Sequence, residues 1–222
     1  MAERTAAAKA ELAGDEPRWP AVLAVIAVAG LYAALPASLS IRPRWLPGTL
    51  IGVLLVPTIL THRRGNERVN QILGQSIAGL LTVFMIWSLV LLMVALPAHT
   101  EAPITLLRSA AALWVTNVMV FALWYWRLDG GGPHHRKLKG IRNSPAFLFP
   151  QMSIAQGAGK HAAKEWSPIF IDYVFLAFNT STAFSPTDAP VLSRWAKVLT
   201  MTQAIISLSV IAILAARAVN IL

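Results

Sequence analysis

The sequence predicts an all-helical integral membrane protein with about six transmembrane helices and both termini in the cytoplasm. The 222-residue chain is 56% hydrophobic and only 13% charged, whereas soluble domains are about 25% charged. Apolar runs of membrane-spanning length recur between short polar segments. Lys and Arg, which give a net charge of +9, gather in alternate loops, as in proteins whose basic loops face an anionic cytoplasmic leaflet.

The composition also argues against several chemistries. The chain has no cysteine, which excludes disulfides, thiolate metal sites and a cysteine nucleophile. His134 and His135 are adjacent, without the spacing of two ligands on one helix face. We therefore expect no enzyme activity, no catalytic residue, no metal ligand and no cofactor. The basic residues lack the interleaved aromatics of nucleic-acid binders, so we expect no nucleic-acid partner.

The N-terminal half reads as a tail followed by a four-helix transmembrane region. Residues 1–18 form a charged cytoplasmic tail, and residues 19–126 hold the four spans. Gly74, Ala78 and Gly79 place small residues on adjacent turns, which predicts close approach of another helix. Asn117 should make an interhelical hydrogen bond. The spans are expected over residues 19–39, 46–61, 71–96 and 104–126.

Residues 127–165 form the longest polar segment and are expected to be a basic cytoplasmic loop. Basic residues next to a membrane attract anionic lipid. We expect four of these residues to contact anionic lipid headgroups of the bilayer or a protein partner: Arg136, Lys137, Lys139 and Arg142.

Residues 166–222 are expected to form a helical hairpin of two crossings, over residues 167–184 and 190–220. A full crossing places 14 Lys and Arg residues inside and five outside. A re-entrant loop from outside would also carry the basic loop outside, so the positive-inside rule favours the crossing.

Polar residues recur inside this hairpin. Asp172 and Asn179 are seven positions apart and share a helix face, and Thr200, Gln203 and Ser207 share another. The two faces either line a pore or cavity, together with Thr180 and Thr182, or hydrogen-bond each other as interhelical contacts. An outer turn follows the first helix, and it is either functional or simply caps and turns the chain. This turn contains Ser185, Pro186, Thr187 and Asp188.

The C-terminal third resembles the pore loop and inner helix of two-helix potassium-type channels over about 55 residues. Phe170, Asp172, Phe175, Phe178, Thr180 and Thr182 match the pore-helix pattern, and Asp188 and Arg194 match positions after it. The resemblance implies a channel-like hairpin. Residues 183–187 lack the filter glycines, so potassium selectivity is not expected.

The chain also resembles a family of bacterial membrane proteins of unknown function. They share the pattern of Phe170, Asp172 and Tyr173 and the Ala-Phe-Ser-Pro-Thr-Asp run at residues 183–188. The expected function is therefore ion transport or a related channel-like activity by a homo-oligomer, in the plasma membrane (a bacterial inner membrane). The alternative is a non-conducting accessory or scaffold protein that docks a partner or anionic lipid through its basic loop.

Overall fold

A computed structural model describes residues 18–63, 66–98, 102–139, 145–157, 166–182 and 189–219. Most of these residues are helical, and they contain no strand apart from one isolated antiparallel bridge between Phe147 and Val191. The all-helical class is therefore confirmed. The long helices are α2 (Trp19–Ala34), α3 (Trp45–Arg63), α4 (Glu67–Ala98), α5 (Pro103–Leu128) and α9 (Arg194–Val219), and the shorter ones are α6 (Pro133–Lys139), α7 (Pro150–Gly157) and α8 (Phe170–Thr182).

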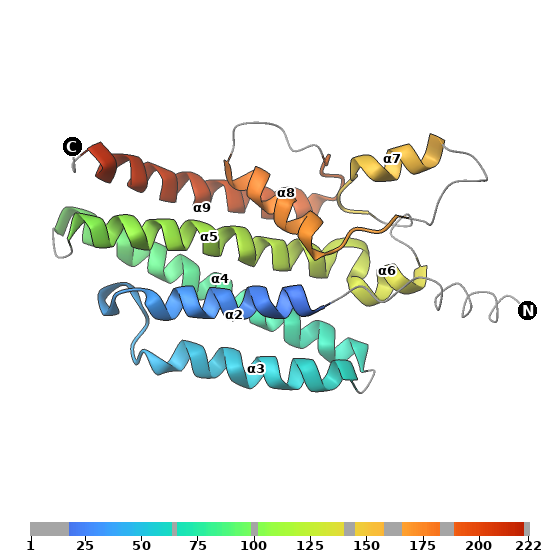
Figure 1. Ribbon diagram of the computed structural model, residues 1–222, viewed down its shortest axis with the longest axis horizontal. Coiled ribbons are helices and arrows are strands. Elements are labelled where there is room, and N and C mark those ends of the chain that lie inside the picture. Colours follow the sequence, from blue (N-terminus) through green and yellow to red (C-terminus); the bar gives the residue numbers. More distant parts are fainter. Residues whose placement is uncertain are drawn as a thin grey trace, which may run out of the picture.

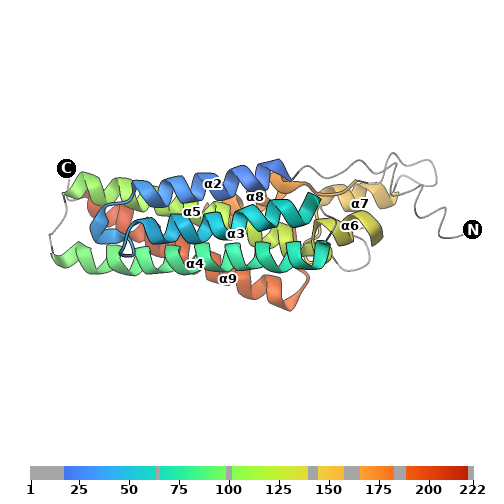
Figure 2. The same ribbon diagram turned by 90° about the horizontal axis from the view of Figure 1, so that it is seen from below.

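The five long helices run side by side along one axis, and successive ones alternate in direction (Figures 1 and 2). We call the end where α2 begins, α3 ends and α5 ends the polar end. At this end the carboxylate of Glu67 pairs with Arg18 at 3.3 Å and lies 3.8 Å from His134. α6 and α7 also lie at the polar end (Figure 1).

α5 is the central helix of the bundle. In the most apolar 18-residue stretch of α5, 61% is buried inside the bundle, against 28% in the corresponding stretch of α9. α5 packs against α2, α4, α8 and α9. Its side chains are buried on several faces, as expected for a helix with neighbours all round. The largest of these buried side chains are Leu106, Leu113, Phe121, Tyr125 and Trp126.

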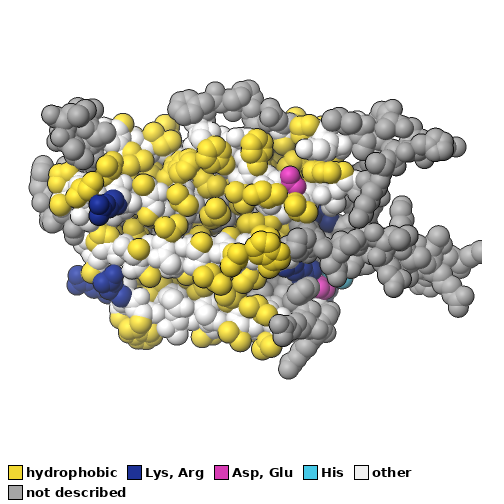
Figure 3. Space-filling model, in the orientation of Figure 1, with side chains coloured by type: hydrophobic (Ala, Val, Ile, Leu, Met, Phe, Trp, Pro, Cys, Tyr) yellow, Lys and Arg dark blue, Asp and Glu magenta, His cyan; other side chains and the backbone are white. Residues whose placement is uncertain are grey.

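Three of the described helices are long and apolar enough to cross a membrane, over Glu67–Leu96, Pro103–Gly131 and Arg194–Ala216. Two shorter apolar helices, Trp19–Ala34 and Trp45–Thr61, accompany them. Large apolar side chains also point outward, for example Val94 at 63% and Ile205 at 67% exposed, and they cover much of the visible face (Figure 3). Many exposed apolar side chains of this kind are typical of a membrane protein.

α8 does not form the expected crossing. It has 13 residues, about 20 Å at 1.5 Å per residue, against a hydrocarbon core of about 30 Å. Pro190 and Leu192 lie at the polar end, where Leu148 N–H donates to the carbonyl of Pro190 at 3.0 Å and Leu192 N–H to that of Ala146 at 2.8 Å. α8 and α9 therefore start at the same end and run in the same direction (Figure 1).

The start of α2 and the end of α9 do not lie at the same end of the bundle, although the expected six-span arrangement requires this. α2 begins at the polar end, whereas α9 finishes at the opposite end (Figure 1). The physical reason is the half-length of α8: because it does not run the length of the bundle, an odd number of full-length helices lies between the two ends. The expected hairpin of residues 166–222 is instead a half-length helix beside a full-length one.

Candidate functional site

The candidate site is a buried polar cluster where the C-terminal end of α8 meets α5 and α9. Asn117, Ser181 and Gln203 are 0% exposed and Ser207 is 1% exposed. Ser181 lies near the end of α8, whereas Asn117 lies eleven residues before the end of α5, about 16 Å along that helix. The cluster is therefore near the middle of the bundle.

Gln203 is the centre of this cluster. Its side-chain amide donates to the carbonyl of Ala177 at 2.7 Å and to the hydroxyl of Ser181 at 2.7 Å. Its amide oxygen accepts a hydrogen bond from the hydroxyl of Tyr125 on α5. A buried glutamine with donors and acceptor all paired fixes its three helices relative to one another.

Ser207 extends the same contacts one turn further. Its hydroxyl donates to the carbonyl of Ser181 and accepts from the indole of Trp114 at 3.1 Å. Asn117 donates to the Ser181 hydroxyl at 3.4 Å and to the Gln203 carbonyl at 3.3 Å, which confirms the expected interhelical bond. Its Oδ1 atom has no hydrogen-bond partner among the described residues.

The last turn of α8 carries the other polar side chains. Thr180 donates to the carbonyl of Leu176 at 2.9 Å and Thr182 to that of Asn179 at 3.0 Å. Such bonds to the preceding turn satisfy hydroxyls in an apolar setting. Asn179, Thr180 and Thr182 are partly exposed, so polar groups remain accessible at the end of this helix.

The start of α8 is held by Asp129, which is 0% exposed. Its carboxylate accepts from Ala146 N–H at 2.7 Å and from the Tyr173 hydroxyl at 2.7 Å. Arg136 donates to the carbonyls of Trp126 and Asp129 at 2.7 and 2.8 Å, and its guanidinium lies 5.2 Å from the Tyr173 ring centre. The end of α5, the basic segment and α8 are therefore joined.

Glycines make the tight turn at Asp129 possible. Gly130, Gly131 and Gly132 have φ of 58°, 80° and 94°, values that side chains other than glycine rarely adopt. A Cβ atom on Gly132 would lie 2.8 Å from Oε1 of Gln71 and 2.9 Å from the Arg127 carbonyl oxygen. The turn thus needs glycine both for its backbone conformation and for its close packing.

Asp172 has a local structural partner. Its carboxylate accepts the backbone N–H of Ile169 at 2.7 Å, the bond by which a third-position acid caps a helix start. Asp172 and Asn179 also line a shared pocket of about 230 Å³ with Phe149 and Phe175. They therefore share a face, as predicted, but this face does not meet Gln203.

The structure places the other expected site residues as follows. Gln203 and Ser207 do face α8, but through Ser181 and Ala177, and they are buried rather than lining open space. Thr200 donates to the carbonyl of Lys197 within its own helix at 2.9 Å. Arg136 is only 3% exposed, which is the wrong environment for lipid contact, because its guanidinium is used inside the turn. Outside the described side chains lie Lys137, Lys139, Arg142, Ser185, Pro186, Thr187 and Asp188.

Sequence reasoning missed two parts of this arrangement. Tyr125 and Trp114 both donate hydrogen bonds into the cluster, and no sequence pattern singles them out for this role. Asp129 and Tyr173 were not recognised as a pair. The available signal was an acid directly before three glycines, because a buried acid at a glycine turn must find donors.

The fold and site together define a bundle of apolar helices with a shorter helix packed against α5 and α9. Comparison of the chain with protein-family models, with curated proteins and with solved structures finds no match. The described residues also contain no group of three or more His, Asp or Glu side chains that could hold a metal ion.

Proposed function

We propose that the chain is a multi-pass plasma-membrane protein with five crossings, its N-terminus in the cytoplasm and α8 re-entering from the cytoplasmic side. The distribution of basic residues supports this topology. With five crossings, 15 of the 19 Lys and Arg residues fall in sequence segments that this topology assigns to the cytoplasm, and the other four are Arg42, Arg44, Arg108 and Arg217. This asymmetry exceeds that of the six-span arrangement.

Within this topology, the protein mediates ion transport, and the end of α8 is the functional element. The observation that carries this proposal is the position of that end, held at mid-depth by Gln203 and Ser207. Half-length helices that end at the membrane midplane are characteristic of ion and substrate sites. The C-terminal end of a helix carries partial negative charge, so the favoured ion is a cation.

The channel resemblance adds support from a different direction. In those channels a short pore helix packs beside a long inner helix. α8 is likewise short, α9 is long, and the two run side by side (Figure 1). Asn179, Thr180 and Thr182 are the partly exposed polar groups at the end of α8. The missing glycines at residues 183–187 argue against potassium selectivity.

A homo-oligomer completes this proposal. α9 exposes a row of large apolar side chains at one-turn and two-turn spacing, which suits packing against a second helix. These are Val198, Met201, Ile205 and Leu208, each more than half exposed. Copies joined through α9 would surround the ends of their α8 helices.

The experiment is cation flux into liposomes that contain the purified protein. Asn179→Leu should lower flux about tenfold, the effect of losing about 1.4 kcal/mol of ion stabilisation. It should leave thermal unfolding nearly unchanged, because Asn179 is partly exposed. Thr202→Val is the matched control, since the Thr202 hydroxyl bonds only the carbonyl of Val198 in its own helix. Equal flux in Asn179→Leu and wild type would contradict the proposal.

A second candidate, the non-conducting accessory or scaffold protein, is favoured by one observation. Gln203 and Ser207 are fully paired and buried within a single chain, so they bond helix to helix rather than face water. A folded wild-type protein without cation flux in liposomes would favour this candidate.

A further inference from the structure

A second feature lies away from α8, at the polar end between α2, α3, α4 and α5. It is a pocket of about 270 Å³, slightly below the roughly 300–1,000 Å³ of typical small-ligand sites. Its inner wall is apolar and includes Ala21, Val25, Ile77 and Leu123, each at most 5% exposed. An apolar chain of an amphiphile fits such a wall better than a polar solute does.

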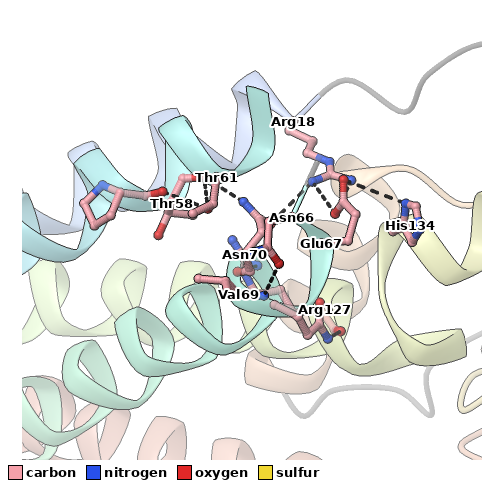
Figure 4. A network of polar contacts seen from close by, with 11 residues as sticks. Arg18, Thr58, Thr61, Asn66, Glu67, Val69, Asn70, Arg127 and His134 are labelled. Atoms are coloured by element: carbon pink, nitrogen blue, oxygen red, sulfur yellow. Dashed lines mark hydrogen bonds and ion pairs between the residues drawn. The ribbon is translucent and has the colours of Figure 1, made fainter. Parts of the chain in front are cut away.

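The mouth of the pocket is basic. Arg18 and Arg127 both line it, next to Asn70 and Thr58 (Figure 4). Arg18 pairs with Glu67 at 3.3 Å and reaches the Asn70 side chain at 3.4 Å. One carboxylate thus accompanies two guanidinium groups among the described residues of this network.

Arg127 has no acidic partner among the residues that the structure describes. Its guanidinium donates to the backbone carbonyl of Asn70 at 3.3 Å and lies 5.3 Å from the ring centre of Trp126. Neither group carries a charge, and no described carboxylate forms an ion pair with Arg127. A charged side chain within an apolar span is costly, and such groups usually pair with an opposite charge or mark a ligand site.

Gly74 makes room for this arginine. A Cβ atom at Gly74 would lie 1.7 Å from Cζ of Arg127 and 1.9 Å from its Nη1. The small residue on α4 therefore admits a guanidinium, not a second helix backbone as the sequence pattern suggested. The chain thus keeps a positive charge at the boundary between the apolar wall and the polar end.

We propose that this pocket binds an anionic phospholipid, with one acyl chain against the apolar wall and the phosphate against Arg127 and Arg18. Guanidinium groups bind phosphate oxygens through paired, charge-assisted hydrogen bonds. The pocket is too small for a whole phospholipid, so the second acyl chain remains in the bilayer. This binding does not depend on ion transport.

The first test uses the full-length wild-type protein in detergent, with phosphatidylglycerol and phosphatidylcholine of identical acyl chains as probes. Native mass spectrometry and lipid-induced thermal stabilisation measure binding. We expect phosphatidylglycerol to bind about tenfold more tightly, corresponding to one charge-assisted hydrogen bond. Equal affinity for the two lipids would overturn the proposal. Tighter binding of oleate than of phosphatidylglycerol would overturn the choice of a phospholipid over a free fatty acid.

The second test uses variants. Arg127→Gln should remove the preference for phosphatidylglycerol, whereas Arg68→Gln should keep it, because Arg68 is exposed at the same end but does not line the pocket. Loss of the preference in both variants would indicate a general surface-charge effect and overturn the site.

A third measurement remains informative if Arg127→Gln does not fold. Wild-type protein is cross-linked to phosphatidylglycerol that carries a diazirine on its acyl chain. The cross-linked peptides should contain Val25 or Ile77, which line the apolar wall. Cross-links confined to α9 would place the lipid elsewhere and overturn the proposal.

Discussion

The amide nitrogen of Gln203 lies 2.7 Å from the hydroxyl oxygen of Ser181, and this contact joins the middle of α9 to the end of α8. The same nitrogen reaches the Ala177 carbonyl at 2.7 Å. A helix that ends in an apolar environment leaves carbonyls without partners, at a cost of several kcal/mol each. Ser207 supplies a side-chain donor to one of these carbonyls, that of Ser181, and Thr182 supplies one to that of Asn179. Gln203 holds the same turn of α8 through Ser181 and Ala177, which helps α8 to end within the bundle.

Replacing Gln203 should destabilise the protein. Gln203→Leu leaves the buried hydroxyls of Tyr125 and Ser181 without their amide partner, at about 1–3 kcal/mol for each unsatisfied group. Thermal unfolding in detergent should show a lower midpoint. Thr202→Val, at the neighbouring position, should change stability by less than about 0.5 kcal/mol. Equal midpoints for Gln203→Leu and Thr202→Val would contradict the assignment of Gln203 as the central contact.

Asp129 and Tyr173 should behave as a coupled pair. Asp129→Asn replaces one acceptor oxygen by an NH₂ group, so either Ala146 N–H or the Tyr173 hydroxyl loses its acceptor, at about 1–3 kcal/mol. Tyr173→Phe removes only the second contact. In a double-mutant cycle of unfolding free energies, the two changes should cost less together than the sum of their separate costs, by about 0.5–3 kcal/mol. Additive costs would show that the 2.7 Å contact contributes nothing to stability.

Asp172 should prove to be a capping residue. Asp172→Asn weakens acceptance of the Ile169 N–H, and loss of a helix cap costs about 0.5–2 kcal/mol. Cation flux per folded protein in liposomes should stay the same, because the structure uses this carboxylate at the start of α8, away from its end. A marked fall in flux with unchanged unfolding would assign Asp172 an ionic role instead.

Topology can be tested cleanly because the chain has no cysteine of its own. Single cysteines at Asn66 and Leu192 should react with an impermeant maleimide from the cytoplasmic side. Cysteines at Ser38 and Ala216 should react from the other side. All four side chains are exposed.

The six-span arrangement makes the opposite assignment for two of these positions. It places Leu192 on the outer side and Ala216 on the cytoplasmic side. Labelling of Leu192 from outside would therefore reject the re-entrant path of α8. The positions Asn66 and Ser38 serve as internal controls, because both arrangements assign them to the same sides.

Much of the architecture was predictable from local sequence. The expected spans over residues 46–61, 71–96 and 104–126 fall within α3, α4 and α5. Apolar runs of sufficient length specify helices whose backbone groups are satisfied internally, whatever their neighbours are. The sequence also predicted that Asp172 and Asn179 share a helix face, because helix periodicity alone determines this.

The candidate site was only partly predictable. Gln203 and Ser207 were recognised from their spacing, which showed a polar face but not its partner. Asn117 was recognised because an amide in an apolar span needs a hydrogen bond. The role of Tyr125 was not predictable, because apolar neighbours suffice for the ring of an aromatic residue in such a span. Only the fold shows that its hydroxyl is buried and needs a hydrogen-bond partner.

The sequence by itself determined the helical class, the apolar exterior and the uneven distribution of basic residues, because each depends on composition and on contacts within one helix. Only the tertiary structure decided that α8 stops halfway, that Arg136 is buried and that Gly74 makes room for Arg127. These features depend on contacts between residues far apart in the chain, such as Asp129 with Tyr173 and Phe147 with Val191. Contacts of this kind hold both flanks of α8 at the polar end, and the sequence of the helix itself does not specify them.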